Sequence, residues 1–199
     1  GSYSAPRTRT SLAGPSALGW VRGLGFWGFL LPVFVIVCHR MVPFFTASVV
    51  PFVTAFRPWW LLAAMVGAPV VHGTVDAFGM AAWTWPVDLP IAGLMLWLTH
   101  RWVLVQSLRN RLLAMLHVGF LWYGMGFLLA GAHSLAVLAG GRGVPLAGLH
   151  ALAIGFAASL MMAMVTRVTC GHSGRTLAAD AVTWRLFQLL QACAVARVA

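Results

Sequence analysis

The chain has 199 residues, of which 61% are hydrophobic and only 8% are charged. Because soluble domains carry about 25% charged residues, this composition excludes an ordinary soluble protein and predicts a protein that crosses the lipid bilayer several times. The formal charge of +10 comes from thirteen arginines against three aspartates. These arginines are spaced between apolar segments and form no basic stripe, so they predict membrane topology rather than nucleic-acid binding.

The two ends and the cysteines carry little chemical information. Residues 1–17 are small and polar and show no signal-peptide pattern, so we expect a polar tail or an internal loop there, followed by one transmembrane domain over residues 18–199. Both ends resemble cuts in a longer chain. The three cysteines lie far apart and form no CxxC motif, which predicts buried free thiols instead of a disulfide framework or a zinc site.

Apolar segments near the roughly 20 residues that a bilayer core requires recur along the chain. They predict an all-α fold, a polytopic bundle of about six transmembrane helices, at about residues 18–38, 57–82, 87–104, 112–137, 146–168 and 178–199. After the first of them, residues 41–52 are apolar but contain Pro43 and Pro51. The two prolines predict a re-entrant or interfacial segment at that point.

The arginines predict the orientation of these helices. Loops that stay in the cytoplasm are enriched in basic residues. The second and fourth loops hold only Arg142, so the first, third and fifth loops are predicted to be cytoplasmic. They hold, in chain order, Arg40, Arg57, Arg101, Arg109, Arg111, Arg167 and Arg175. The arginines before residue 23 argue the other way, as expected if further spans precede this tail.

Histidines at membrane depth are the main candidates for function, because polar groups there are costly. His150 and His172 are 22 positions apart, which is roughly 33 Å along a helix, so they cannot share one metal ion. We expect two sites, one near each membrane face. An antiparallel hairpin would bring His133 near His150 at one face and His117 near His172 at the other. Imidazole suits haem iron and copper, although a lone histidine can also hydrogen-bond a carbonyl or water.

Other residues around these histidines have two readings each. His72 and Asp76 are spaced i, i+4, so the carboxylate either orients a metal-binding imidazole or simply satisfies it near the interface. Arg167 and Arg175 either mark the cytoplasmic side or bind haem propionates or lipid phosphates. Two further patterns indicate packing: methionines 161, 162 and 164 favour a core role, and small residues at 147, 151, 155 and 159 let a neighbouring helix come close or make room for a macrocycle.

Several of these motifs, read together, resemble the NnrS family of bacterial membrane proteins. The resemblance extends from Trp20 onward and includes Ser173 where the family usually has threonine. It is carried by Leu149-His150-Ala151-Leu152, Gly155, Met164-x-x-Arg167, Gly171-His172-Ser173-Gly174-Arg175, Arg40 to Thr46, Arg57 to Trp60, Pro86 to Pro90 and the neighbourhood of His117.

This resemblance implies a haem- and copper-containing protein of the bacterial inner membrane that takes part in the response to nitric oxide, by ligand binding or electron transfer. The family has about twelve spans, so the chain corresponds to its second half. Its histidine ligands are expected in the order His150 and His172, then His117 and His133, then His72, with Arg167 and Arg175 as partners.

The alternative function is a non-catalytic accessory subunit that packs against a larger respiratory or photosynthetic membrane complex. The small-residue stripe and the aromatic boundaries are compatible with it. No Ser-His-Asp order, phosphate loop or carboxylate pair indicates hydrolysis or phosphoryl transfer, so a redox role at a metal is the one enzymatic reading.

Overall fold

The computed structural model describes residues 20–21, 23–174 and 177–199, and within these ranges the chain is helical with no strand, which confirms the all-α class. The polar segment 1–17 and Arg175 lie outside the described residues. The elements are η1 (Gly23–Leu30), α2 (Leu31–Val49), α3 (Trp59–Ala77), η2 (Ala81–Trp83), α4 (Trp85–Arg101), α5 (Leu104–Ser107), α6 (Arg111–Leu138), α7 (Ala147–His150), η3 (Ala151–Ala158), α8 (Ser159–His172) and α9 (Ala181–Val198).

Four helices are long and apolar enough to cross a membrane. They are Gly23–Val49, Trp59–Ala77, Arg111–Leu138 and Ala147–His172. The other two predicted spans do not meet the same criteria of length and hydropathy. Helix α4 has only 17 residues, and α9 carries two arginines and two glutamines within 18 residues. By length and composition the described residues therefore support four spans rather than six.

The first helix is longer than predicted. The π-helical η1 runs directly into α2, so one helix extends from Gly23 to Val49 and Pro43 lies inside it. The predicted interfacial segment at 41–52 is therefore wrong. In apolar surroundings a helix satisfies the remaining backbone groups even where proline removes one hydrogen bond. The helix ends where Val50 becomes extended before Pro51, because proline disfavours the helical conformation of the residue that precedes it.

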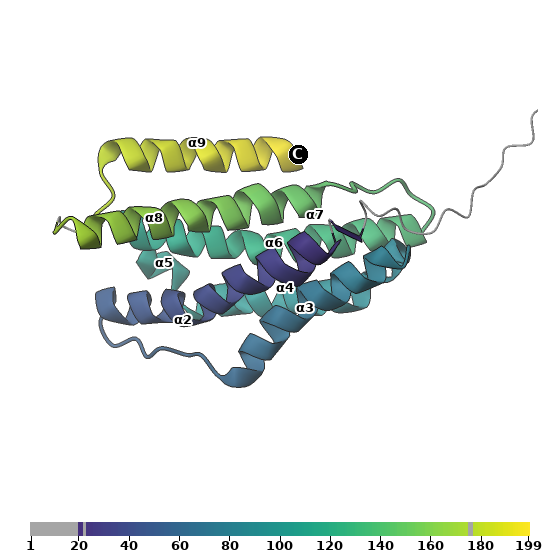
Figure 1. The fold of residues 1–199 in the computed structure, drawn as a ribbon, viewed down its shortest axis with the longest axis horizontal. Coiled ribbons are helices and arrows are strands. Elements are labelled where there is room, and N and C mark those ends of the chain that lie inside the picture. Colours follow the sequence, from purple (N-terminus) through teal and green to yellow (C-terminus); the bar gives the residue numbers. More distant parts are fainter. Residues whose placement is uncertain (1–19, 22, 175–176) are drawn as a thin grey trace, which may run out of the picture.

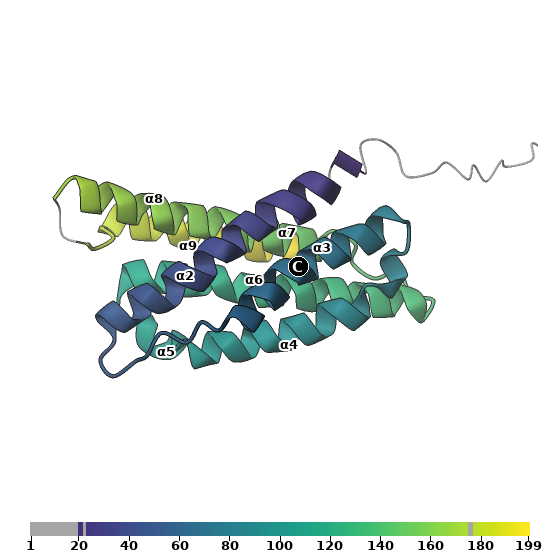
Figure 2. The ribbon, with the colours of Figure 1, turned by 60° about the horizontal axis from the view of Figure 1, so that its bottom comes forward.

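Helix α6 is the centre of the bundle, with α4, α2 and the segment α7-η3-α8 around it (Figures 1 and 2). Its N-terminus is capped by the Asn110 side chain, which accepts hydrogen bonds from Leu112 N and Leu113 N. Glycines along α6 let neighbouring side chains approach closely: a Cβ on Gly124 would lie 3.1 Å from Leu96 of α4. These close approaches fix how α6 meets its neighbours.

The segment α7-η3-α8 is a continuous helix antiparallel to α6, as predicted for the hairpin (Figure 1). Its small residues Ala147, Ala151, Gly155 and Ser159 are all buried, and Gly155 leaves the space that the Trp122 indole of α6 occupies. The stripe therefore serves close helix packing, one of its two predicted roles. Helix α9 lies along the outer side of this segment (Figure 1).

Charge is distributed unequally between the two ends of the bundle. One end holds the C-terminal ends of α2, α4 and α8 and the start of α6, and with them most of the described arginines. The opposite end holds the turn between α3 and α4 and the loop between α6 and α7 (Figure 1). Asp76 and Asp88 lie at this second end.

Candidate functional site

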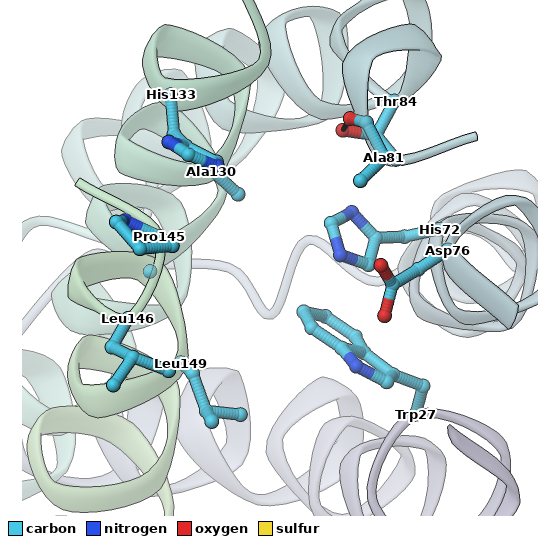
Figure 3. Close-up of a pocket in the computed structure, with 11 residues that line it drawn as sticks. Trp27, His72, Asp76, Ala81, Thr84, Ala130, His133, Pro145, Leu146 and Leu149 are labelled. Atoms are coloured by element: carbon cyan, nitrogen blue, oxygen red, sulfur yellow. Dashed lines mark hydrogen bonds between the residues drawn. The ribbon is translucent and has the colours of Figure 1, made fainter. Parts of the chain in front are cut away.

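A cavity of about 230 Å³ opens at the second, arginine-poor end of the bundle (Figure 3). Five separate segments of the chain contribute to its wall, so it exists only in the folded bundle. Its lining residues are Trp27 of η1, His72 and Asp76 of α3, Ala81 of η2, Thr84 just before α4, Ala130 and His133 of α6, Pro145 and Leu146 of the loop after α6, and Gly148 and Leu149 of α7. Two of the predicted ligands, His72 and His133, therefore share one cavity.

His72 is held by a buried carboxylate and an indole. Its Nδ1 lies 2.7 Å from Oδ1 of Asp88, which is fully buried. The Trp27 ring lies against the imidazole with 3.9 Å between centroids, and Gly73 has no Cβ to block that approach. The Asp88 carboxylate accepts from Nδ1–H, and in the neutral imidazole Nε2 then keeps its lone pair. The sequence left open whether Asp76 orients His72 or simply satisfies it, and in the structure the hydrogen bond of Nδ1 goes to Asp88 of the next helix.

His133 lies across the cavity from His72, on α6 (Figure 3). Its Nδ1 is buried and has no hydrogen-bond partner among the described residues. Gly143, at φ +55°, packs so closely that an added Cβ would collide with this nitrogen. Oδ2 of Asp88 and Nε1 of Trp85 are also buried without a partner at this end. Buried polar groups are nearly always satisfied, so this concentration of unsatisfied atoms is typical of a site that receives a ligand or water.

His150 does not face this cavity, although its neighbour Leu149 lines it. Its Nδ1 lies 3.2 Å from the carbonyl oxygen of Arg197, and its Nε2 lies 3.3 Å from Nη2 of Arg197. Consecutive side chains on a helix point about 100° apart, so His150 turns towards α9. The structure gives both ring nitrogens a partner there and does not bring His150 to His133.

The other predicted pair, His117 and His172, is separated along the helix axis. Gly119 lies opposite Leu160, so His117 lies opposite about residue 161. His172 is some eleven residues farther on, or roughly 16 Å at 1.5 Å per residue. His172 is exposed at the end of α8, whereas His117 is fully buried.

His117 is bonded to helix α2. Its Nε2 lies 2.9 Å from Oγ1 of Thr46, and that hydroxyl donates its own proton to the Val42 carbonyl at 2.7 Å. The hydroxyl must therefore accept from Nε2–H, which leaves Nδ1 of His117 as a buried acceptor without a partner among the described residues. This nitrogen is a second candidate ligand position, away from the cavity.

Arg167 is half-buried near the arginine-rich end. Its guanidinium carbon lies 3.4 Å from the centroid of the Phe45 ring on α2, a cation–π contact between two helices. Its predicted partner Arg175 is outside the described residues, so the structure does not test the pair as a binding site for propionates or phosphates.

The side chains that line the cavity and could bind a metal are two imidazoles and the Asp76 carboxylate. Among the described residues, no three His, Cys, Asp or Glu side chains lie close enough to hold one metal ion. Imidazole nitrogens are donors that suit copper and other transition-metal ions. A haem does not fit the enclosed space, because about 230 Å³ is below the roughly 300–1,000 Å³ of pockets that hold drug-sized ligands.

Sequence reasoning missed Asp88 and Trp27 as parts of this site. A signal was present for Asp88, because a carboxylate between Pro86 and Pro90 at a helix start is costly in a membrane protein and marks function. No signal identified Trp27, since an indole at membrane depth is as typical of packing as of a binding site.

An all-helical bundle with apolar spans and a buried histidine–carboxylate pair defines the class: a membrane protein with a polar site at one end. The chain belongs to the NnrS family, whose model, described as NnrS protein, matches residues 7–199. Comparison with curated proteins and with solved structures gave no match.

Proposed function

We propose that this NnrS-family chain binds a redox metal through His72 and His133 and takes part in the response to nitric oxide. The observation that carries the proposal is the hydrogen bond of 2.7 Å between Nδ1 of His72 and buried Asp88, at a cavity that His133 also lines. A histidine that binds a metal generally donates its other ring N–H to a carboxylate or carbonyl. His72 has this arrangement before any metal is considered.

Each side chain around the cavity has a role in this proposal. Asp88 fixes the ring orientation and proton position of His72, so that Nε2 is the donor atom. Trp27 covers one face of the imidazole and keeps water from it. When bound, a copper ion would supply a redox-active centre that coordinates small ligands such as nitric oxide.

Haem is the other metal centre that we propose for this chain. Because the cavity does not enclose a macrocycle, haem would use ligands elsewhere. His150, His172 and His117 are those candidates, with Arg167 and Arg175 as propionate partners. The buried, unpartnered Nδ1 of His117 supports this set most directly.

The test is an optical spectrum and an elemental analysis of the purified protein. We expect bound copper that falls in His72→Ala and His133→Ala and is retained in the control His100→Ala, whose side chain is exposed at the other end of α4. A Soret band would indicate haem, and its loss in His117→Ala would assign that ligand. Protein without a Soret band and without metal would refute the proposal.

We further propose six crossings of a bacterial inner membrane, with α4 and α9 completing the four apolar spans. In support, α4 is antiparallel to α6 along most of its length, and α9 follows α8 (Figure 2). The loops with Arg40, Arg101 to Arg111, and Arg167 to Arg175 would then be cytoplasmic, and the His72 cavity would open towards the other side.

The alternative function is an accessory subunit without metal chemistry. It drew on the small-residue stripe as a surface for a partner. In the structure Gly155 and Ser159 are already covered, by Trp122 and by Gln191. The stripe therefore no longer favours this alternative.

A further inference from the structure

An apolar groove of about 240 Å³ lies between α2 and α8, and none of the side chains that line it carries nitrogen or oxygen. Its floor contains Cys38 and Leu160, each 1% exposed. Its rims contain Val33, Val37 and Met161, which are 43%, 40% and 53% exposed. Because both helices are long and apolar enough to span a membrane, the open side of the groove lies at the depth of the lipid acyl chains.

The two ends of the groove differ in charge. At one end Phe34 of α2 packs against Phe156, with 6.1 Å between the ring centroids. At the other end the Arg167 guanidinium reaches from α8 to the Phe45 ring of α2, 3.4 Å from its centroid. Arg167 is one helical turn beyond Met164, which lines the groove. An apolar groove therefore leads to a cation that an aromatic ring holds in place.

Arg167 has no anionic partner within the described part of the chain. Its guanidinium makes the contact with Phe45 and neither a salt bridge nor a hydrogen bond there. A guanidinium carries five N–H donors, and an arginine in a membrane span normally has a partner. Arg40 lies three positions beyond Val37 and is likewise without a salt bridge among the described residues. Two unpaired cations beside an apolar groove match a ligand with an anionic head and an apolar chain.

We propose that the groove binds one acyl chain of an anionic phospholipid and that Arg167 holds its phosphate. A guanidinium can donate two parallel N–H···O hydrogen bonds to phosphate oxygens. The position along the helix suits this role, because Arg167 is five residues from the end of α8, roughly 7.5 Å, and is therefore close to the headgroups. Arg40 adds a second positive charge to the site.

A lipid phosphate suits Arg167 better than a haem propionate does. None of the histidines lines the groove. Its volume of about 240 Å³ is below the roughly 300–1,000 Å³ of pockets that hold drug-sized ligands, whereas an acyl chain needs only a narrow apolar groove. The lipid site shares no residue with the cavity of His72 and His133, so it does not depend on a metal there.

The experiment is native mass spectrometry of the full chain in detergent, titrated with phosphatidylglycerol or with zwitterionic phosphatidylcholine of the same acyl chains. We expect one phosphatidylglycerol to stay bound with about tenfold higher affinity than phosphatidylcholine. Arg167→Gln should weaken phosphatidylglycerol binding by about 10–100-fold, the range expected for a lost hydrogen bond to a charged group. Arg101→Gln is the matched control and should bind as the unaltered chain does, because Arg101 contacts Phe56 at the same end of the bundle but belongs to α4.

A second pair of variants tests the groove itself. Val37→Trp fills the groove and should weaken the binding of both lipids about tenfold, which corresponds to about two methylene groups left unburied. Ile36→Trp is the control, because Ile36 is 43% exposed and does not line the groove. Both replacements are at exposed positions of α2, so neither removes a core contact.

Equal affinity for the two lipids would overturn the proposal, and so would equal phosphatidylglycerol binding by Arg167→Gln and Arg101→Gln or by the two tryptophan variants. If Arg167→Gln lost a Soret band and kept phosphatidylglycerol, the guanidinium would belong to haem and the lipid site would be refuted. His72→Ala/His133→Ala should keep lipid binding intact, which separates failure of this site from failure of the proposed function.

Discussion

At the scale of single residues, the pair of His72 and Asp88 decides the chemistry of the arginine-poor end. An imidazole alone could carry its proton on either nitrogen and hydrogen-bond any carbonyl. The buried carboxylate of Asp88, 2.7 Å away, fixes the proton on Nδ1. It does so at the expense of its own second oxygen, which has no partner among the described residues. The hydrogen bond therefore leaves Nε2 of His72 as the ring nitrogen that can bind a ligand, while Oδ2 of Asp88 stays unpaired.

The coupling within this pair is measurable by a double-mutant cycle. Asp88→Leu leaves a buried N–H of His72 without an acceptor, which costs about 1–3 kcal/mol of the free energy of unfolding. His72→Phe keeps a ring against Trp27 but leaves the buried carboxylate of Asp88 without its hydrogen-bond donor, at a similar cost. Because the double variant removes both polar groups, its loss should be smaller than the two single losses combined. Additive losses in denaturant unfolding would show that the two side chains are independent.

Gly143 should control the position of His133. Its φ of +55° disfavours any other residue, and an added Cβ would collide with the imidazole. Gly143→Ala should cost about 1–2 kcal/mol from the backbone and also lower metal affinity by displacing the ring. Gly140→Ala is the control, since Gly140 has φ +80° and open space around it. Gly140→Ala should therefore lower the stability of the protein and leave its metal affinity unchanged. Equal metal binding by both variants would contradict a ligand role for His133.

At the scale of elements, the sequence predicted where the helices lie along the chain better than which side of each helix faces its neighbours. The predicted hairpin of α6 with the next helix is confirmed, because long apolar segments and a short loop leave few other arrangements. The pairing of His133 with His150 could not be predicted as well. It depends on which side of α7 each residue occupies. Leu149 faces the cavity, whereas His150, one residue later, points towards Arg197. Helix rise is known from sequence, whereas helix rotation follows from packing.

Helix α9 is held by a polar network that the sequence did not indicate. Gln191 accepts a hydrogen bond from Nε1 of Trp122 at 2.7 Å and donates one to Oγ of Ser159 at 2.7 Å, so three helices meet at one amide. Such hydrogen bonds between membrane helices average roughly 0.6 kcal/mol and reach about 1.7 kcal/mol.

Gln191→Leu should therefore destabilise the docking of α9. We expect a loss of about 1–2 kcal/mol in unfolding experiments in detergent, since two hydrogen bonds go and the Trp122 N–H is left unpaired. The control is Gln188→Leu on the same helix, where the side chain is exposed. A smaller effect at position 191 than at position 188 would mean that the network contributes nothing to docking.

At the scale of the whole molecule, the uneven distribution of arginine matches the uneven distribution of candidate sites. Arg101, Arg109 and Arg111 surround the short helix α5, whereas His72, Asp88 and His133 gather at the other end. The arginine pattern was legible in the sequence because it needs only the order of loops and spans. The cavity could not be predicted in the same way, since its wall combines five segments whose meeting depends on glycines such as Gly73 and Gly143.

The orientation of the bundle is testable with single cysteines in a variant that lacks the three native ones. Val105→Cys, in α5, and Val144→Cys, in the loop between α6 and α7, replace exposed residues at opposite ends. Because basic loops stay in the cytoplasm, a membrane-impermeant thiol reagent added to intact cells should label position 144, and position 105 only after permeabilisation. The reverse pattern would place the His72 cavity on the cytoplasmic side. Labelling of both positions from outside would show that helix α6, which joins them, does not cross the membrane as proposed.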